Sequence, residues 1–203
     1  MNGPILVIKL GGSLLDCPAW PDRLARFLAS RPEARPVLIV GGGKFADALR
    51  DLDSIHALGE PRSHALALRI LDATAHIAAA LLPGSVVVDE VDDLPEVWAA
   101  GSTPILAPRR FLDLDDLSPD PLPHAWTTTT DSIAARVAVR LGASELILLK
   151  SCPLPPGAQT WEAAAALGLV DPEFPRAVEK IPRTRLICLK DSDNVLGEGF
   201  APP

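Results

Sequence analysis

Residues 5–15 read ILVIKLGGSLL, an apolar run that ends at a lysine and two glycines. The run ILVI, which has no polar alternation, is typical of a strand covered on both faces in the parallel sheet of an α/β domain. Gly11 and Gly12 allow the backbone to approach a ligand closely, and their N–H groups can face an anion. Together with Lys9 and the hydroxyl of Ser13, they predict a phosphate site. The alternative is a plain glycine turn with Lys9 reaching solvent.

A second apolar strand has a similar ending. Residues 36–40, PVLIV, lead directly into Gly41, Gly42 and Gly43. In open α/β sheets ligands bind outside the carboxyl ends of the strands, so we expect the two glycine turns to line one site. A helix starting at Gly43 would direct its N-terminal dipole at an anion. GGGKFA also fits the loose GxGxxA pattern of dinucleotide-binding proteins, but no strand ending in an acid follows at the usual distance.

A third segment adds charged groups to this edge of the sheet. Residues 127–143, TTTTDSIAARVAVRLGA, predict a helix that Thr130 or Asp131 caps. The following strand, ELILLK, places Lys150 at a carboxyl end, as the first strand places Lys9. Two strand-end lysines and an aspartate at a helix start predict a site in which the carboxylate holds both cations. A plain helix cap is the alternative role for Asp131.

The chain between these segments predicts a long helix and a loop. From about 60 to 82 an apolar stripe indicates a helix with this buried face: Leu66, Ile70, Ala73, Ile77 and Leu81. His64 and Arg69 on this helix belong either to a solvated face or to an acceptor pocket. Short strands are expected at 85–89 and 104–108. Residues 111–126 lack a period and predict a loop, with His124 and Trp126 at a pocket rim.

Composition limits the classes of protein that remain. With 203 residues the chain most simply forms one domain, and a formal net charge of −7 disfavours non-specific nucleic-acid binding. No apolar run approaches the length of a membrane span, and no export signal is recognisable. The three cysteines are scattered and lack a CxxC pair, which favours a reducing cytoplasm and disfavours structural zinc.

VIKLGGSLL, IVGGGKFAD and TTDSIAA followed by LILLK, in this order and spacing, resemble the amino acid kinase family. That family includes acetylglutamate, aspartate, uridylate and isopentenyl phosphate kinases, and the likeness covers about residues 5–150. Within it, LPHAW, TTDSIAA, LLKS and VDPEFP look most like the 5-(aminomethyl)-3-furanmethanol phosphate kinases of methanofuran-type one-carbon cofactor synthesis.

The resemblance implies a three-layer αβα sandwich with a mainly parallel central sheet, and ATP with Mg²⁺ as the phosphoryl donor. It divides the single domain into an acceptor-binding lobe, 1–126, and a shortened nucleotide-binding lobe, 127–203. It also implies a small-molecule substrate and assembly of identical subunits. No nucleic acid, membrane or side-chain metal site is expected.

The resemblance also suggests which residues form the site. Lys9 would contact the transferring phosphoryl group, with Gly11, Gly12 and Ser13 beside it, and Asp131 would organise the lysines. Many members of the family carry a threonine-aspartate pair where this chain has Lys150-Ser151, and their second catalytic lysine comes later. Lys150 and Lys180 are therefore alternatives for that role, although the strand-end position favours Lys150. Expected acceptor contacts are Gly41, Gly42, Gly43, His64, Arg69, His124 and Trp126; expected nucleotide contacts are Thr130, Ser132, Ser151, Asp171 and Lys180.

These features predict transfer of the ATP γ-phosphoryl group to a small phosphomonoester. Phosphoryl transfer requires alignment and charge neutralisation more than covalent chemistry, and a phosphate acceptor is already anionic and needs no general base. The first alternative is a kinase of the same fold that acts on an amino acid carboxylate or a nucleoside monophosphate. The second is a non-catalytic relative that binds a nucleotide or an oxyanion.

Overall fold

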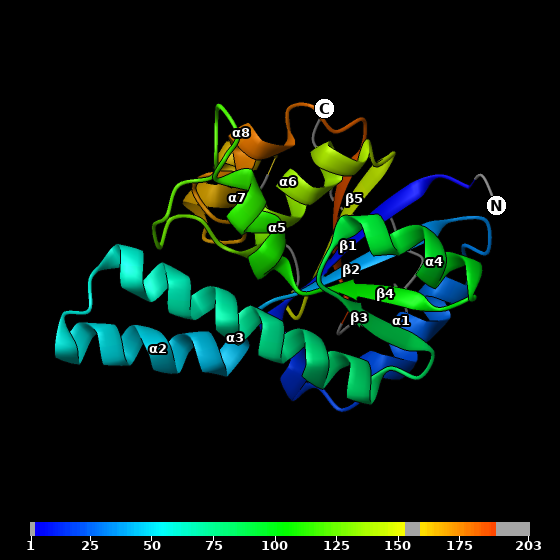
Figure 1. The fold of residues 1–203 in the computed structure, drawn as a ribbon, viewed down its shortest axis with the longest axis horizontal. Coiled ribbons are helices and arrows are strands. Elements are labelled where there is room, and N and C mark those ends of the chain that lie inside the picture. Colours follow the sequence, from blue (N-terminus) through cyan, green and yellow to red (C-terminus); the bar gives the residue numbers. More distant parts are fainter. Residues whose placement is uncertain (1–2, 153–158, 190–203) are drawn as a thin grey trace.

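The computed structural model describes residues 3–152 and 159–189. Its centre is a six-stranded sheet in the order β3-β4-β2-β1-β5-β6, with all neighbouring strands parallel (Figure 1). The strands are β1 (Ile5–Leu10), β2 (Arg35–Val40), β3 (Ser85–Val88), β4 (Thr103–Leu106), β5 (Glu145–Lys150) and β6 (Thr184–Cys188). The apolar runs of the sequence therefore form the predicted parallel sheet.

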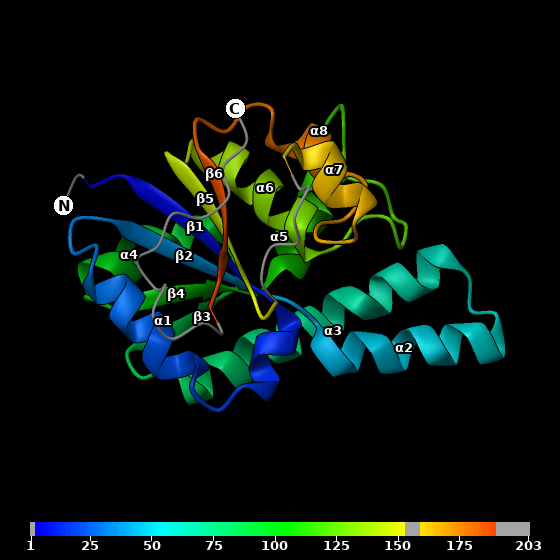
Figure 2. The same cartoon turned by 180° about the vertical axis from the view of Figure 1, so that it is seen from behind.

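Helices cover both faces of this sheet. They are α1 (Trp20–Ala29), α2 (Gly43–His56), α3 (Glu60–Leu81), α4 (Leu94–Ala99), α5 (Pro108–Asp115), α6 (Thr130–Leu141), α7 (Trp161–Ala166) and α8 (Phe174–Val178), with 3₁₀ turns η1 (Gly12–Asp16) and η2 (Val91–Asp93). Because side chains alternate along a strand, Ile8 joins the core formed with α1, whereas Val7 joins the core formed with α6. Figure 2 shows the sheet between these two layers, which confirms the three-layer sandwich.

The buried face of α3 differs from the predicted stripe. Leu66 and Leu81 are 42% and 48% exposed, whereas the helix buries Ser63, His64, Leu68, Leu71, Thr74, Ala75 and Ala78. Apolar residues occur almost all round this helix, so its periodicity does not distinguish one face. Small side chains such as Ala75 and Ala78 are completely covered and allow close packing on the sheet. The prediction for this face was therefore wrong.

The predicted loop 111–126 begins with helix. Residues up to Asp115 belong to α5, because Phe111 and Leu112 are buried in the core beside α6. The hydroxyl of Thr129 caps α6 by accepting a hydrogen bond from the Asp131 N–H at 3.4 Å, so neither Thr130 nor Asp131 is the cap. The alternative role of Asp131 as a plain helix cap, which the sequence left open, is therefore wrong.

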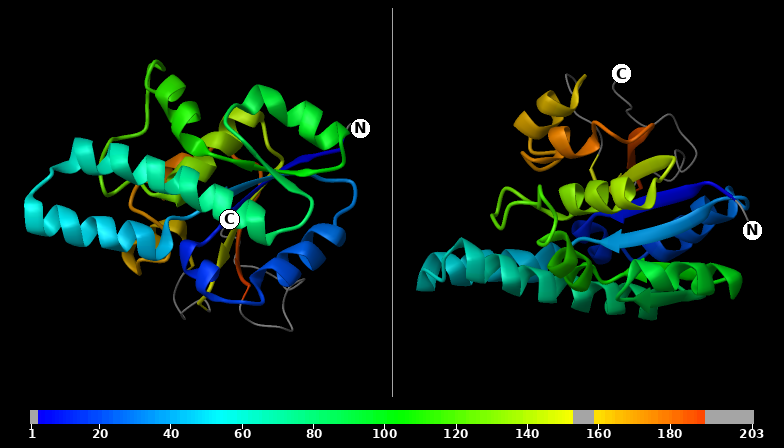
Figure 3. Two further views of the ribbon diagram at one scale, coloured as in Figure 1. Left: turned by 60° about the horizontal axis from the view of Figure 1, so that its bottom comes forward. Right: turned by 45° about the horizontal axis from the view of Figure 1, so that its top comes forward.

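Helices α2 and α3 form a hairpin that projects beyond the sheet (Figure 3). With 22 residues, α3 is the one helix in the described part of the chain that is long and apolar enough to cross a membrane by length and composition. It packs against α2, α5 and three strands, which identifies it as a helix of the α/β body.

The two glycine turns lie against each other at the carboxyl edge of the sheet. A Cβ on Gly12 would lie 2.1 Å from the Gly43 nitrogen and 2.9 Å from the Gly41 carbonyl carbon. Gly43 itself has φ of 52°, a left-handed conformation that glycine adopts without strain. Only main chain fits between these turns, and their contact brings the ends of β1 and β2 to one crevice.

We expect Gly12→Ala to reduce the free energy of unfolding by about 3 kcal/mol or more, since the added Cβ meets main chain that cannot rotate away. In a chain of this size the melting temperature should fall by roughly 6 °C or more. Gly101→Ala is the control: its Cβ would meet nothing within 4 Å, and only its φ of 73° is unfavourable. That variant should lose about 1 kcal/mol. Equal melting temperatures for the two variants would contradict the collision.

Candidate active site

Two lysines and one aspartate meet at the carboxyl ends of β1 and β5. Lys9 Nζ lies 2.9 Å from Asp131 Oδ1, and Lys150 Nζ lies 2.7 Å from Asp131 Oδ2. Lys9 and Asp131 are only 6% and 4% exposed. Lys9 pairs in register with Leu148 of the neighbouring strand, so the sheet ladder brings the two lysines to the same edge. The predicted convergence of these three side chains is therefore present in the structure.

Burial and mutual charge determine the protonation of this group. Burial, assisted by the neighbouring Lys9 ammonium, lowers the pKa of Lys150 to about 8 although Asp131 opposes the shift. Burial alone would raise the pKa of Asp131, but the two ammonium groups outweigh it and hold that pKa below its ordinary value. At neutral pH two cations thus share one carboxylate. The cluster has one uncompensated positive charge, which favours an anionic ligand.

The glycine turns supply fewer free amides than their sequence indicates. The Gly11 N–H donates to the Leu149 carbonyl at 2.8 Å, and the Gly41 N–H donates to the Leu10 carbonyl at 2.9 Å. These two amides therefore belong to the sheet edge. Gly12 and Gly43 begin η1 and α2, where the first N–H groups have no partner within the helix. The amides available to an anion are those of the helix starts.

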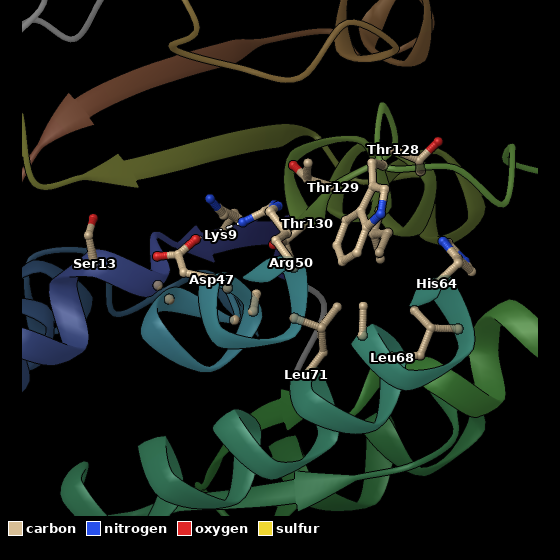
Figure 4. Close-up of a pocket in the computed structure, with 18 of the residues that line it drawn as sticks. Lys9, Ser13, Asp47, Arg50, His64, Leu68, Leu71, Thr128, Thr129 and Thr130 are labelled. Atoms are coloured by element: carbon tan, nitrogen blue, oxygen red, sulfur yellow. Dashed lines mark hydrogen bonds and ion pairs between the residues drawn. The ribbon is translucent and has the colours of Figure 1, made fainter. Parts of the chain in front are cut away.

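A cavity of about 280 Å³ opens beside this cluster (Figure 4). Lys9 lies at one side and His64 at the other, with Leu68 and Leu71 of α3 facing Thr128, Thr129 and Thr130. Other lining residues are Gly12, Ser13, Gly41, Gly42, Gly43, Ala46, Asp47, Arg50, Ala67, Ala125, Trp126 and Ile133. The cavity is thus cationic at the strand ends and largely apolar and aromatic toward α3.

Two stacked histidines lie at the distant end of the cavity, and one of them, His64, lines it. His64 stacks on His124 with ring centroids 4.7 Å apart and planes 8° from parallel. His124 Nε2 lies 2.7 Å from Asp116 Oδ1. Burial lowers the pKa of His64, and the nearby His124 lowers it further. His64 is therefore neutral at pH 7. It lines the cavity, where the sequence predicted a contact with the acceptor.

Several predicted contacts do not line this cavity, among them Arg69, His124 and Lys180. Arg69 is exposed on α3 and does not line it. Lys180 is exposed after α8 and borders a separate surface pocket with Asp120 and Arg136. Between the two lysines that the sequence left as alternatives, Lys150 is the one that contacts Asp131.

Asp171 and Ser132 form the internal support of α6. Asp171 accepts hydrogen bonds from the backbone N–H groups of Thr129 and Ser132 at 2.9 and 3.0 Å, and from the hydroxyls of both residues. Ser132 is completely buried, and the carboxylate of Asp171 is occupied by these donors. Both side chains, expected to contact a nucleotide, instead fix the helix start that presents Asp131. The sequence did not indicate this support of α6, because Asp171 lies in a loop far from the helix in the chain.

Other residues at the site come from distant parts of the chain. Ser13 Oγ and Ser151 Oγ are 2.8 Å apart and join the end of β1 to the end of β5. Arg50, which lines the cavity, was not predicted as a contact; it lies four residues after Ala46, another lining residue, on α2. One helical turn separates the two positions, so the helix period could have identified Arg50.

The chain is similar to known proteins in sequence and in fold. The profile of the amino acid kinase family matches residues 4–153. A Methanocaldococcus jannaschii protein named [5-(aminomethyl)furan-3-yl]methyl phosphate kinase is 29% identical over 144 residues, which are 70% of this chain and 63% of the relative. The chain thus spans less than two thirds of that relative's length.

Solved structures of low sequence identity share the fold. Uridylate kinase from Archaeoglobus fulgidus superposes with a TM-score of 0.64 at 17% identity, covering 90% of each chain. UMP kinase from Ureaplasma parvum gives 0.65 at 14% identity, covering 94% of this chain and 92% of that one. These similarities extend the likeness of fold through the C-terminal part that the sequence motifs cover weakly.

We expect Asp171→Asn to lower the free energy of unfolding by about 2–3 kcal/mol, because an amide NH₂ would face N–H donors in place of a charged acceptor. Urea denaturation measures the loss. The control is Glu173→Gln in the same turn, whose side chain accepts none of these bonds and whose stability should remain within about 0.5 kcal/mol of the parent. An Asp171→Asn protein as stable as the control would show that the carboxylate does not support α6.

Proposed function

Because the chain belongs to the amino acid kinase family, we propose that it is a phosphotransferase that moves the γ-phosphoryl group of ATP to a small phosphomonoester. The best candidate acceptor is [5-(aminomethyl)furan-3-yl]methyl phosphate, the compound in the name of the M. jannaschii relative. The product would be the corresponding diphosphate, which a methanofuran-type cofactor pathway would consume. The proposal rests on the Lys9–Asp131–Lys150 cluster at the crevice of the two glycine turns.

The cluster suits a group whose charge changes during transfer. An oxygen of the acceptor phosphate attacks the γ-phosphorus as the bond from that phosphorus to the bridging β-phosphate oxygen breaks, and ADP leaves. Lys9 and Lys150 would stabilise the oxygens of the moving group without reorganisation, because Asp131 already fixes both ammonium groups. Asp131 is unsuited to act as a base, since both of its oxygens are paired with lysines.

The acceptor end has complementary chemistry. Arg50 and the free amides at the start of α2 would bind the acceptor's own phosphate. Trp126, Leu68 and Leu71 would cover a flat ring. The Thr128 hydroxyl is buried at the cavity and has no hydrogen-bond partner within residues 3–152 and 159–189, so it is available to a ligand.

Magnesium would enter on the nucleotide. Within the described part of the chain, no group of three His, Cys, Asp or Glu side chains is placed to hold a metal ion. Mg²⁺ commonly keeps several waters and binds through substrate phosphates with one or two carboxylates. The residues present therefore fit an ion carried by ATP, where it would neutralise charge on the β- and γ-phosphates.

We extend the proposal to the division of the chain into lobes, to its assembly and to its location in the cell. We assign the acceptor to residues 1–126 and the nucleotide to the side of β5 and residues 127–203. Exposed apolar side chains on the hairpin, among them Phe45, Leu52 and Ile55, support assembly of identical copies through α2 and α3. The cysteines Cys17, Cys152 and Cys188 are all free, which supports a reducing cytoplasm.

We expect Lys9→Ala to reduce acceptor-dependent ADP formation at least about a hundredfold, because it removes a preorganised cation from the moving group. Folding should persist, since Asp131 retains Lys150 as its partner. The assay would compare the furan phosphate, UMP and an amino acid as acceptors. Lys180→Ala is the control and should keep full turnover. Unchanged turnover in Lys9→Ala, or ADP formation with no dependence on any acceptor, would refute the proposal.

The pH profile should report Lys150. Its ammonium form, present below a pKa of about 8, is the form that can bind phosphate. We therefore expect kcat/KM for ATP to be level below about pH 8 and to fall with rising pH above it. Lys150→Arg should remove this alkaline fall, because arginine remains charged, even though its absolute rate is lower. A profile that rises through pH 8 would contradict a cationic role for Lys150.

A further inference from the structure

The segment after α5 contacts the α2–α3 hairpin at two points across the cavity. Trp126 Nε1 donates a hydrogen bond to Asp53 Oδ2 at 2.8 Å, and His124 stacks on His64 at 4.7 Å. The partners are 73 and 60 residues apart in the chain, so these side-chain contacts join parts that are distant in sequence. Trp126 and His64 both line the cavity.

Asp53 is built to hold the indole of Trp126. Its other oxygen accepts the Gly59 N–H at 3.0 Å, which ties the carboxylate to the turn between α2 and α3. The hydrogen bond from Trp126 is the main reason that the pKa of Asp53 lies below its ordinary value. Arg50, one turn before Asp53, has its guanidinium carbon 5.0 Å from the centroid of the Trp126 ring. The indole is thus held by its edge and by one face.

The segment is also anchored on the side away from the hairpin. Arg136 of α6 donates to Asp115 Oδ1 at 2.7 Å, to Ser118 Oγ at 3.0 Å and to the Asp120 carbonyl at 2.5 Å. The second oxygen of Asp115 accepts the Leu122 N–H at 3.2 Å. Because its preceding residues are fixed to α6, Trp126 cannot follow a movement of the hairpin. Such a movement would break the hydrogen bond between Trp126 and Asp53.

We propose that Trp126 and His64, which His124 backs by stacking, form a clamp over the ring end of the acceptor, and that Asp53 is the positioning residue that sets the clamp by holding Trp126. This inference rests on the proposed function and makes it more specific: the clamp selects phosphomonoesters that carry one small flat ring over nucleoside monophosphates. None of the comparisons assigns a role to Asp53.

The shape of the cavity gives the reason for this selectivity. Its apolar part is bounded by Leu68 and Leu71 on one side and by the segment that contains Trp126 on the other (Figure 4). A single aromatic ring fits such a slot and is stabilised by offset or edge contacts with the indole. A nucleoside adds a ribose between phosphate and base, so its base would extend to the His64–His124 stack. An indole fixed by its N–H cannot rotate freely to make room.

The test uses binding of the furan phosphate and of UMP to the full chain, measured by calorimetry without ATP. The wild-type protein should bind the furan phosphate at least about tenfold more tightly than UMP. Trp126→Phe keeps an aromatic face but removes the N–H donor, and Asp53→Ala removes the acceptor. Each should weaken binding of the furan phosphate by about fivefold to tenfold and narrow the preference over UMP.

A double variant separates positioning from a purely structural role. If one hydrogen bond accounts for both effects, Asp53→Ala with Trp126→Phe should bind the furan phosphate no more weakly than either single variant. In turnover assays these variants should raise KM for the acceptor, while kcat and KM for ATP stay within about twofold. Asp51→Ala removes an exposed carboxylate on the same helix and should match the wild type.

Two outcomes overturn the clamp: wild-type protein that binds UMP as tightly as the furan phosphate, or Trp126→Phe with unchanged affinity while Asp53→Ala loses affinity. The second would mean that Asp53 acts only through the turn at Gly59. Failure of the proposed function is a distinct result: the wild-type protein would bind the furan phosphate with the stated preference but form no ADP when ATP is added. Binding and turnover therefore test the two proposals separately.

Discussion

The site depends on one buried carboxylate that is shared by two ammonium groups. Placing Lys9 and Lys150 side by side under cover would be unfavourable without Asp131, because burial and mutual repulsion both disfavour the charged forms. Asp131 opposes this cost in part, since the pKa of Lys150 still lies at about 8, and it leaves a single positive charge at the crevice. Its own position is fixed by Thr129 and by Asp171, which bind the first turn of α6. The electrostatics of the crevice therefore depend on a loop more than thirty residues further along the chain.

A second constraint is steric and lies in the main chain. The turns after β1 and β2 touch at Gly12 and Gly43, where no Cβ fits. This contact brings the starts of η1 and α2 together at the sheet edge that carries the lysines, and the first N–H groups of a helix have no partner within it. Amides held in this way need no reorganisation when an anion arrives. The hydrogen bonds made by Gly11 and Gly41 hold the turns to the sheet.

Sequence reasoning located the parts of the site that strands determine. Uninterrupted apolar runs identify parallel strands, and the carboxyl ends of parallel strands share one edge, so Lys9, the glycine turns and Lys150 were predictable from the pattern. The face of α3 was not, because Leu66 and Leu81 are as apolar as Leu68 and Leu71 and small alanines decide the packing. The support of α6 by Asp171 and the contact of Trp126 with Asp53 join distant residues through side chains. Periodicity along the sequence cannot predict contacts between such distant side chains.

The two ends of the cavity are consequently built in different ways. At the phosphoryl end, the ladder between β1 and β5 sets the positions of Lys9 and Lys150, and a shift of either strand would disturb the whole sheet. At the opposite end, the hairpin and the segment containing Trp126 meet through a hydrogen bond and a ring stack. None of the residues in these two contacts belongs to a strand of the sheet. The strand ladder thus positions the charges at one end of the cavity, and side-chain contacts between distant parts of the chain hold Trp126 at the other.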